Sequence, residues 1–180
     1  MKTIPVPISG LKLLQPNIFI DDRGYFFESY NYETFQTLGI KDVFVQDNQS
    51  YSKKNVIRGL HFQTPPFAQA KLVRVIKGSV LDVAVDIRKN SPTFGKHCPV
   101  LLSEENQLQF YIPVGFAHGF VALQDDTIFA YKCSNIYHKD SERSLLFYDT
   151  VLNINWGVDN PVATEKDLQA VSFKDFISPF

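Results

Sequence analysis

The sequence predicts an all-β fold, a sandwich or barrel built from short strands. Strand-like segments recur along most of the 180 residues, and turn-forming Gly, Pro, Asn and Asp residues separate them. Very little of the chain has the period of a helix. The alternation of strands and helices that builds a parallel nucleotide-binding sheet is also missing. We therefore expect a single β domain, residues 1–180, with only short peripheral helices.

The N-terminal part predicts a hairpin followed by a helix. A turn at 21–24 would join strands at 17–20 and 24–29. Residues 31–38 would form the helix, because Asn31 is a good N-cap and Gly39 follows the expected end.

The rest of the chain predicts mainly strands. The clearest alternation lies at 79–88, where every second residue is Leu, Val or Ile. The sequence Thr-Glu-Lys-Asp at 164–167 is typical of a capping box, so a C-terminal helix is expected at about 164–170. The other expected strands are 43–46, 56–63, 70–77, 98–102, 108–112, 119–123, 128–133 and 151–156.

Charge and composition narrow the classes of partner. The net charge of −1 gives no electrostatic reason to expect nucleic acid or a membrane surface, so any bound anion must meet a local group of cations. The two cysteines, Cys98 and Cys133, lie in apolar runs and predict buried thiols rather than a disulfide. No spanning segment or apolar leader is seen, which predicts a cytoplasmic protein.

The segment 58–78 predicts the wall of a binding cavity. Two apolar runs separated by Pro65-Pro66 carry six polar side chains: Arg58, His61, Gln63, Gln69, Lys71 and Arg74. By the period of two, Gly59, His61 and Gln63 would share one face of a strand. The alternative for His61 is a hydrogen-bonded core histidine, but the nearby polar residues favour a cavity.

Residues 113–118 contain P-x-G-x-x-H, which resembles the second signature of the cupins, the double-stranded β-helix jelly-roll barrels. His61-Phe62-Gln63 stands where cupins have H-x-H, and Lys71 stands where they have a metal-binding Glu. An ammonium group has no lone pair and cannot bind a metal ion. This replacement favours a site that stabilises an anion and has no metal. A metal-dependent cupin oxygenase or isomerase remains an alternative.

A set of motifs spread over most of the chain resembles the dTDP-4-dehydrorhamnose 3,5-epimerase family. The motifs are F-x-D-D-R-G-x-F-x-E (19–28), Q-D-N-Q-S (46–50), R-G-L-H-F-Q (58–63), A-Q-A-K-L-V (68–73), G-S-V-L-D-V-A-V-D-I-R (78–88), S-P-T-F-G (91–95), P-x-G-F-A-H-G-F (113–120) and Tyr131-Lys132. The resemblance implies a substrate with a 4-keto-6-deoxy sugar on thymidine diphosphate. Epimerisation beside a ketone needs a base, an acid on the opposite face and positive charge near the ketone oxygen. His61 would be the base, Tyr131 the acid and Lys71 the charge, with no cofactor.

The resemblance also assigns roles to Asp167 and His118. Asp167 would hydrogen-bond and orient His61, although an ordinary helix-capping acid is the alternative. His118 would bind near the sugar, with a structural histidine in a tight turn as the alternative.

The nucleotide end would be bound by residues from several segments. Arg23 and Arg58 match contacts to the diphosphate, for which a guanidinium is well suited. The remaining matches on the nucleotide side are Phe19, Phe26, Glu28, Gln46, Asn48 and Tyr137. The alternatives are a solvated turn arginine for Arg23, a core residue for Phe26 and a surface aromatic for Tyr137. The resemblance further implies a homodimer in which strands at about 17–29 are exchanged.

The expected reaction is conversion of dTDP-4-dehydro-6-deoxy-D-glucose to dTDP-4-dehydro-L-rhamnose at C3 and C5. A related epimerase that inverts one centre of another 4-keto nucleotide sugar would use the same residues. A catalytically silent cupin that binds a sugar nucleotide is a third alternative, but none of His61, Lys71 and Tyr131 is missing.

Overall fold

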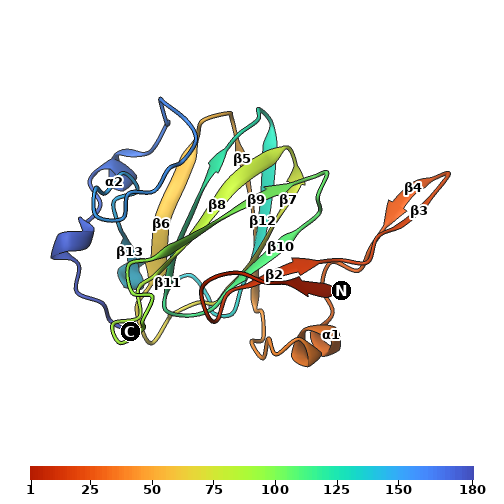
Figure 1. The fold of residues 1–180 in the computed structure, drawn as a ribbon, viewed down its shortest axis with the longest axis horizontal. Coiled ribbons are helices and arrows are strands. Elements are labelled where there is room, and N and C mark those ends of the chain that lie inside the picture. The colour runs from red at the N-terminus through yellow and green to blue at the C-terminus, as the bar shows by residue number, and fades with distance from the viewer.

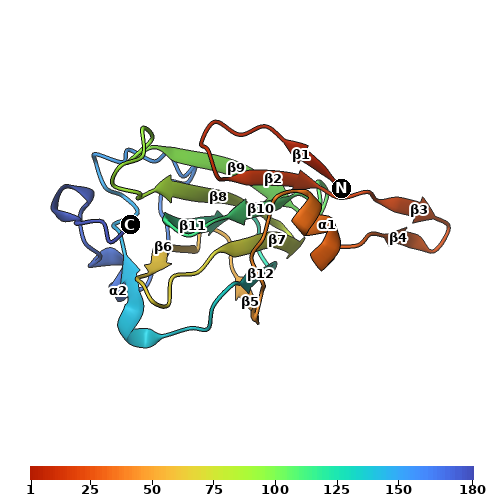
Figure 2. The same cartoon turned by 90° about the horizontal axis from the view of Figure 1, so that it is seen from below.

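A computed structural model describes residues 1–180 and confirms the all-β fold. Two antiparallel sheets face each other in the manner of a jelly roll (Figures 1 and 2). The six-stranded sheet has the order β1-β2-β10-β7-β12-β5 and the five-stranded sheet has the order β13-β6-β11-β8-β9; their ladders are not joined into one continuous barrel. Neither α-helix is long or apolar enough to cross a bilayer.

The strand bounds are β1 Lys2–Ile4, β2 Lys12–Gln15, β3 Phe19–Asp21, β4 Gly24–Phe26, β5 Gln46–Ser52, β6 Ile57–Gln63, β7 Lys71–Lys77, β8 Ser79–Asp86, β9 His97–Ser103, β10 Gln109–Ile112, β11 Phe116–Ala122, β12 Thr127–Cys133 and β13 Glu142–Ser144. The helices are α1 Tyr32–Thr37 and α2 Glu165–Leu168, with short 3-10 turns at Lys139–Ser141 and Phe173–Asp175.

The main core fills the space between the two sheets. It includes Val73, Phe110 and Phe129 from the six-stranded sheet and Ala84 and Phe120 from the five-stranded sheet. These side chains are at most 4% exposed, so they supply much of the hydrophobic stabilisation of the fold.

Two smaller cores lie on the outer faces. Val83, Val85 and Ile87 of the alternating segment pack outside the five-stranded sheet, against the chain that follows β13. The period of two predicted at 79–88 is therefore confirmed. On the other side, α1 is capped by the Asn31 side chain and Phe35 packs against the six-stranded sheet.

Several predicted elements are wrong or displaced. The strand predicted at 43–46 is displaced: residues 43–45 are not in a strand, and β5 begins at Gln46. β5 has a polar sequence because its inward side chains face a cavity rather than the core. Residues 151–156 contain turns, although Leu152 and Trp156 are buried as predicted for apolar residues. β11 begins at Phe116, three residues before the predicted 119. β1, β2 and β13 were not expected, since segments of three or four residues carry almost no periodic signal.

A β-bulge in β6 changes which residues share a face. Arg58 lies opposite Phe120 and His61 opposite His118, so two residues of β6 face the single Gly119. The predicted face is therefore wrong for Gly59: Arg58 and His61 line the cavity, and Gly59 does not. A Cβ at Gly59 would lie 2.4 Å from the Gly119 Cα, and φ is +136°, so both the space and the backbone require glycine.

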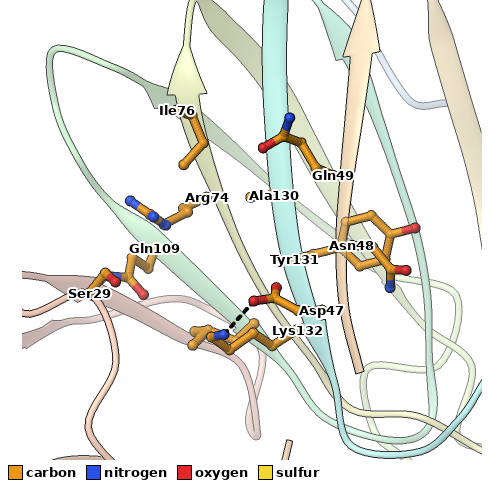
Figure 3. A pocket seen from close by; sticks show the side chains of 11 residues that line it. Ser29, Asp47, Asn48, Gln49, Arg74, Ile76, Gln109, Ala130, Tyr131 and Lys132 are labelled. Atoms are coloured by element: carbon orange, nitrogen blue, oxygen red, sulfur yellow. Dashed lines mark hydrogen bonds and ion pairs between the residues drawn. The ribbon is translucent and has the colours of Figure 1, made fainter. Parts of the chain in front are cut away.

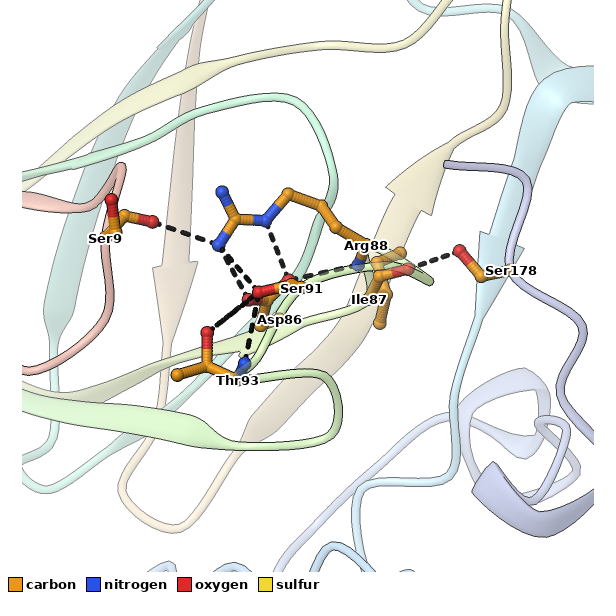
Figure 4. A network of polar contacts seen from close by, with 7 residues as sticks. All are labelled: Ser9, Asp86, Ile87, Arg88, Ser91, Thr93 and Ser178. Carbon is orange, nitrogen blue, oxygen red and sulfur yellow. Dashed lines mark hydrogen bonds and ion pairs between the residues drawn. The ribbon is translucent and has the colours of Figure 1, made fainter.

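A buried carboxylate fixes the loop after β8 (Figure 4). Asp86 accepts hydrogen bonds from Arg88, Ser91 and Thr93, each at 2.6 Å to Oδ2. Burial by itself would raise the pKa of Asp86, but these hydrogen bonds lower it to about 2. Arg88 also donates to the carbonyl of Ser9, which ties the N-terminal segment to this loop.

Candidate active site

A cavity of about 430 Å³ lies between the sheets and the C-terminal segment. It brings together six residues predicted from the sequence: Arg58, His61, Lys71, His118, Tyr131 and Asp167. Arg58 and His61 come from β6, whereas Lys71 and Tyr131 come from β7 and β12 of the opposite sheet. The cavity also touches the core, since Phe120 and Phe129 belong to both.

His61 is paired with a buried carboxylate. His61 Nε2 lies 2.6 Å from Asp167 Oδ1, and the two side chains are 29% and 3% exposed. An acid that is almost completely buried interacts more strongly with a neighbouring imidazolium than one in water. The pair therefore fixes the His61 ring at the cavity and places a negative charge beside it.

The capping box holds Asp167 in this position. Thr164 is the N-cap of α2; its hydroxyl accepts from the Asp167 N–H and lies 2.9 Å from Asp167 Oδ2. Burial alone would raise the pKa of Asp167, but the hydrogen bonds with His61 and Thr164 hold it below its ordinary value. Asp167 is thus both a capping acid and the partner of His61, so the two alternatives from the sequence are compatible.

Lys71 and Tyr131 face His61 from the other sheet. Lys71 is in none of the ion pairs of the chain. Burial lowers its pKa, while the nearby Cys133, Asp82 and Glu142 act in the opposite direction. Burial raises the pKa of the Tyr131 hydroxyl, so it stays protonated and can donate a proton.

His118 belongs to a second histidine–carboxylate pair. Its Nε2 lies 2.8 Å from Asp82 Oδ2, and the side chains are 7% and 0% exposed. Burial lowers the pKa of His118, and Asp82 partly opposes that shift. His118 lines the cavity but is also held by a structural partner, which is consistent with a binding rather than a proton-transferring role.

A smaller hollow of about 120 Å³ adjoins the cavity and shares His61, Lys71 and Tyr131 with it. Its other lining residues include Gln46, Asn48, Tyr137 and Glu142, of which only Glu142 was not singled out from the sequence. Glu142 accepts from the Tyr137 hydroxyl at 2.9 Å and forms an ion pair with Lys166 at 2.5 Å.

Glu142 and Lys166 are the charged wall residues that sequence reasoning missed. Glu142 lies in the short strand β13, which has no apolar pattern. Lys166 directly precedes Asp167 in the capping box, and this adjacency was the one signal that could have indicated it.

The family model of dTDP-4-dehydrorhamnose 3,5-epimerase matches residues 5–175. The chain belongs to this family. An epimerase of this name from Salmonella typhimurium is 52% identical over 172 residues, which are 94% of each chain.

Solved structures agree with this assignment. The chain superimposes on dTDP-4-dehydrorhamnose 3,5-epimerase from Elizabethkingia anophelis with a TM-score of 0.93 and 49% identity, covering 97% of both chains. The 3,5-epimerase from Legionella pneumophila, solved with dTDP-4-keto-L-rhamnose, gives a TM-score of 0.94 at 47% identity and covers 98% of this chain and 94% of its own. The predicted cupin-type fold and family are therefore confirmed, and the chain is an isomerase.

The donor set does not fit the metal site of a cupin. No group of three or more His, Cys, Asp or Glu side chains is gathered to hold a metal ion. Lys71 occupies the place of the carboxylate ligand, and its ammonium group has no lone pair to offer.

The N-terminal hairpin, β3–β4, carries predicted binding residues that do not reach the cavity of their own chain. The hairpin projects from the sandwich (Figure 1), and Phe19 and Phe26 are 64% and 70% exposed. Phe26 is therefore not a core residue. Arg23 lies in an exposed turn, paired with Asp21 at 2.6 Å. Glu28 accepts hydrogen bonds from Asn31 and Thr34 near the start of α1.

A separate hollow of about 400 Å³ lies on the outer face of the six-stranded sheet (Figure 3). We call it the outer-face hollow; its lining includes Arg74, Gln109 and the Asp47–Lys132 ion pair. It shares Asn48 and Tyr131 with the hollows on the inner face, but none of the residues His61, Lys71 and Asp167. Gln109 is 0% exposed, and both polar atoms of its amide lack a hydrogen-bond partner. Such a group normally has a partner.

Proposed function

We propose that the chain converts dTDP-4-dehydro-6-deoxy-D-glucose to dTDP-4-dehydro-L-rhamnose by removing and returning protons at C3 and C5. The observation that carries this proposal is the position of the paired His61–Asp167 on one side of the cavity, with Lys71 and Tyr131 on the opposite sheet. A sugar ring between the sheets would have a base on one face and an acid on the other.

His61 is the base. A proton on a carbon next to the C4 ketone is acidic because its removal gives an enolate. As His61 takes this proton it becomes an imidazolium, and the carboxylate of Asp167 at 2.6 Å stabilises that charge.

Lys71 and Tyr131 complete the inversion. The ammonium group of Lys71 stabilises the negative oxygen of the enolate, which needs no metal or other cofactor. Tyr131 then donates its proton to the carbon from the opposite face, so the new C–H bond has inverted configuration. His61 then releases its proton to solvent and Tyr131 takes one up, after which the same two steps act at the second centre.

The nucleoside diphosphate is bound at the cavity mouth and the smaller hollow. Arg58 is an exposed residue that lines the cavity. Its guanidinium donates to Ser52 and to the carbonyl of Tyr51, and its remaining N–H groups can contact the diphosphate. His118 binds near the sugar. Gln46, Asn48 and Tyr137 lie on the nucleotide side, in the smaller hollow. In this proposal Arg23, Phe19, Phe26 and Glu28 act on the cavity of a second copy of the chain.

A homodimer with exchanged hairpins is supported by two unpartnered surfaces. The hairpin exposes Ile20 (81%) and Phe26 (70%) in addition to Phe19, and a projecting apolar arm of this kind is typical of an interface. The outer-face hollow, with the unpartnered amide of Gln109, is a second surface that a partner chain can cover.

Ile20→Asp should therefore shift the mass in analytical ultracentrifugation from dimer to monomer; a monomeric wild-type protein would overturn this part of the proposal.

Proton exchange tests the reaction directly. In deuterated buffer, the wild-type protein should introduce deuterium at C3 and C5 of dTDP-4-dehydro-6-deoxy-D-glucose, followed by NMR. His61→Ala should abolish this exchange, and wild-type exchange in that variant would exclude His61 as the base. Tyr131→Phe should keep some exchange but lose inversion by about 10²- to 10⁴-fold. Exchange at only one carbon would instead identify a single-centre epimerase.

A further inference from the structure

Gln63 is the last residue of β6, the strand that carries His61, and its side chain forms hydrogen bonds to two loops. The residue is 5% exposed. Its Nε2 donates to the carbonyl of Phe67 at 2.6 Å and to the carbonyl of Ile136 at 3.1 Å, and its Oε1 accepts from the N–H of His138 at 2.7 Å. All three partners are main-chain atoms, in the loops that follow β6 and β12.

Two of these partners flank Tyr137. Gln63 holds the carbonyl before this residue and the N–H after it, and Gln46 Oε1 accepts from the N–H of Tyr137 itself at 2.8 Å. Two glutamine amides thus fix the main chain of residues 136–138. A loop of this kind would otherwise sample several backbone conformations.

Further contacts join the two loops to each other. The rings of Phe67 and His138 stack with their centroids 3.9 Å apart and their planes at 3°. Gln69 donates from Nε2 to the carbonyl of Asn135 at 2.7 Å. Gln63 lies where the strand meets this double loop, so it connects the loop to the rigid sheet.

Tyr137 extends from the loop after β12 and lies at the edge of the smaller hollow. It is 53% exposed, and its hydroxyl donates to Glu142 at 2.9 Å. Its main chain is held from three directions while much of its side chain remains accessible. This is the arrangement expected of an aromatic contact that is set in place before the ligand arrives.

A direct contact between Gln63 and substrate is a poorer explanation. An amide has two N–H donors, and both are already used on main-chain carbonyls. The oxygen also accepts one hydrogen bond. Although Gln63 lines the smaller hollow, it has little capacity left for a ligand.

We propose that Gln63 is a positioning residue that holds Tyr137 ready for the nucleoside diphosphate end of the substrate. The proposal rests on the epimerase function given above. It separates binding from chemistry within one strand: His61 acts on the sugar, whereas Gln63, two residues later, sets the affinity for the nucleotide. Without Gln63, the loop must be ordered at each binding event, which weakens binding and leaves the chemical step unchanged.

The test uses the full-length protein and compares Gln63→Met with Thr64→Val. Met keeps the length of the side chain but removes all three hydrogen bonds. Thr64 is the next residue and joins the same loops, mainly through its main-chain N–H to the carbonyl of Ser141, which Val keeps. Gln63→Met should raise KM for the 4-keto nucleotide sugar, and the dissociation constant of dTDP, by about 10- to 100-fold, which corresponds to ordering one or two residues. kcat should stay within about twofold of wild type, and Thr64→Val should change neither constant.

A double-mutant cycle with Tyr137→Ala separates positioning from general support of the fold. If Gln63 acts through Tyr137, adding Gln63→Met to Tyr137→Ala should raise KM little further. Gln63→Glu is the second variant: it keeps an acceptor for His138 but loses both donors, so it should also raise KM.

Four results would overturn the proposal: a lower kcat with unchanged KM, an unchanged KM in both Gln63 variants, the same rise in KM with and without Tyr137, or failure of both Gln63 variants to fold. If the wild-type protein neither binds dTDP nor epimerises the sugar, the proposed function fails and this inference fails with it. A wild-type enzyme that is active and is insensitive to Gln63 refutes this inference alone.

Discussion

Replacing Asp167 by Asn removes the negative charge next to His61 and keeps nearly the same shape. In the native pair, Nε2 and Oδ1 are 2.6 Å apart and the carboxylate is 3% exposed. Two unit charges about 4 Å apart interact by about 4 kcal/mol at an effective dielectric constant of about 20. If that stabilisation is present only when His61 holds the proton, its loss slows proton removal by about 10³-fold.

Solvent deuterium exchange at saturating substrate measures this step. We expect Asp167→Asn to lower the rate of exchange at C3 and C5 by about 10³-fold while the protein stays folded. Thr164→Val is the matched control, because Thr164 contacts the other oxygen of Asp167 and caps α2. It should cost about 1 kcal/mol of stability as a lost cap and less than tenfold in rate.

The two variants distinguish the charge of Asp167 from its capping role. If Asp167→Asn exchanges deuterium within tenfold of wild type, the carboxylate does not support the base and our interpretation is wrong. Equal losses in Asp167→Asn and Thr164→Val would show that α2 matters only as a structural element.

Three further outcomes follow from the structure. The pKa of Asp86, lowered from 3.8 to about 2, should contribute about 2 kcal/mol of stability at pH 7 and about half of that at pH 3, because the contribution of a depressed pKa is lost as the pH falls toward the folded value. The difference in unfolding free energy between wild type and Asp86→Asn, measured in urea, should shrink over the same pH range, and a constant difference would contradict this. Gly59→Ala should destabilise the fold by about 3 kcal/mol or more, because its Cβ meets Gly119 and its φ is positive; an unchanged urea midpoint would show that the bulge is not tightly packed. Burial lowers the pKa of Lys71, so in a profile of exchange rate against pH the rate should begin to fall below pH 10.5. Lys71→Arg should move this alkaline fall to higher pH, because a guanidinium keeps its charge; an unchanged profile would assign the fall to another group.

The sequence by itself determined the class of fold, the family and six of the polar residues that line the cavity. Alternation at 79–88 and turn residues between apolar runs predict strands because each strand buries one face. The chemistry was also readable locally: Lys71 in place of a metal-binding carboxylate excludes that ligand set whatever the exact geometry. Asn31 and Thr164 predicted helix starts because a cap is formed within four residues.

Only the tertiary structure decided what depends on contacts between distant segments. The pair His61–Asp167 joins residues 106 positions apart, and nothing local distinguishes it from a simple cap. β5 is polar because it faces a cavity that other strands create. The search for an apolar pattern therefore placed this strand too early, at 43–46. The bulge that turns Arg58 and His61 to the same side arises from the close approach of Gly59 to Gly119, two residues from different strands. Apolar periodicity in the sequence indicates which face of a strand is buried. It does not indicate where two sheets leave a cavity between them.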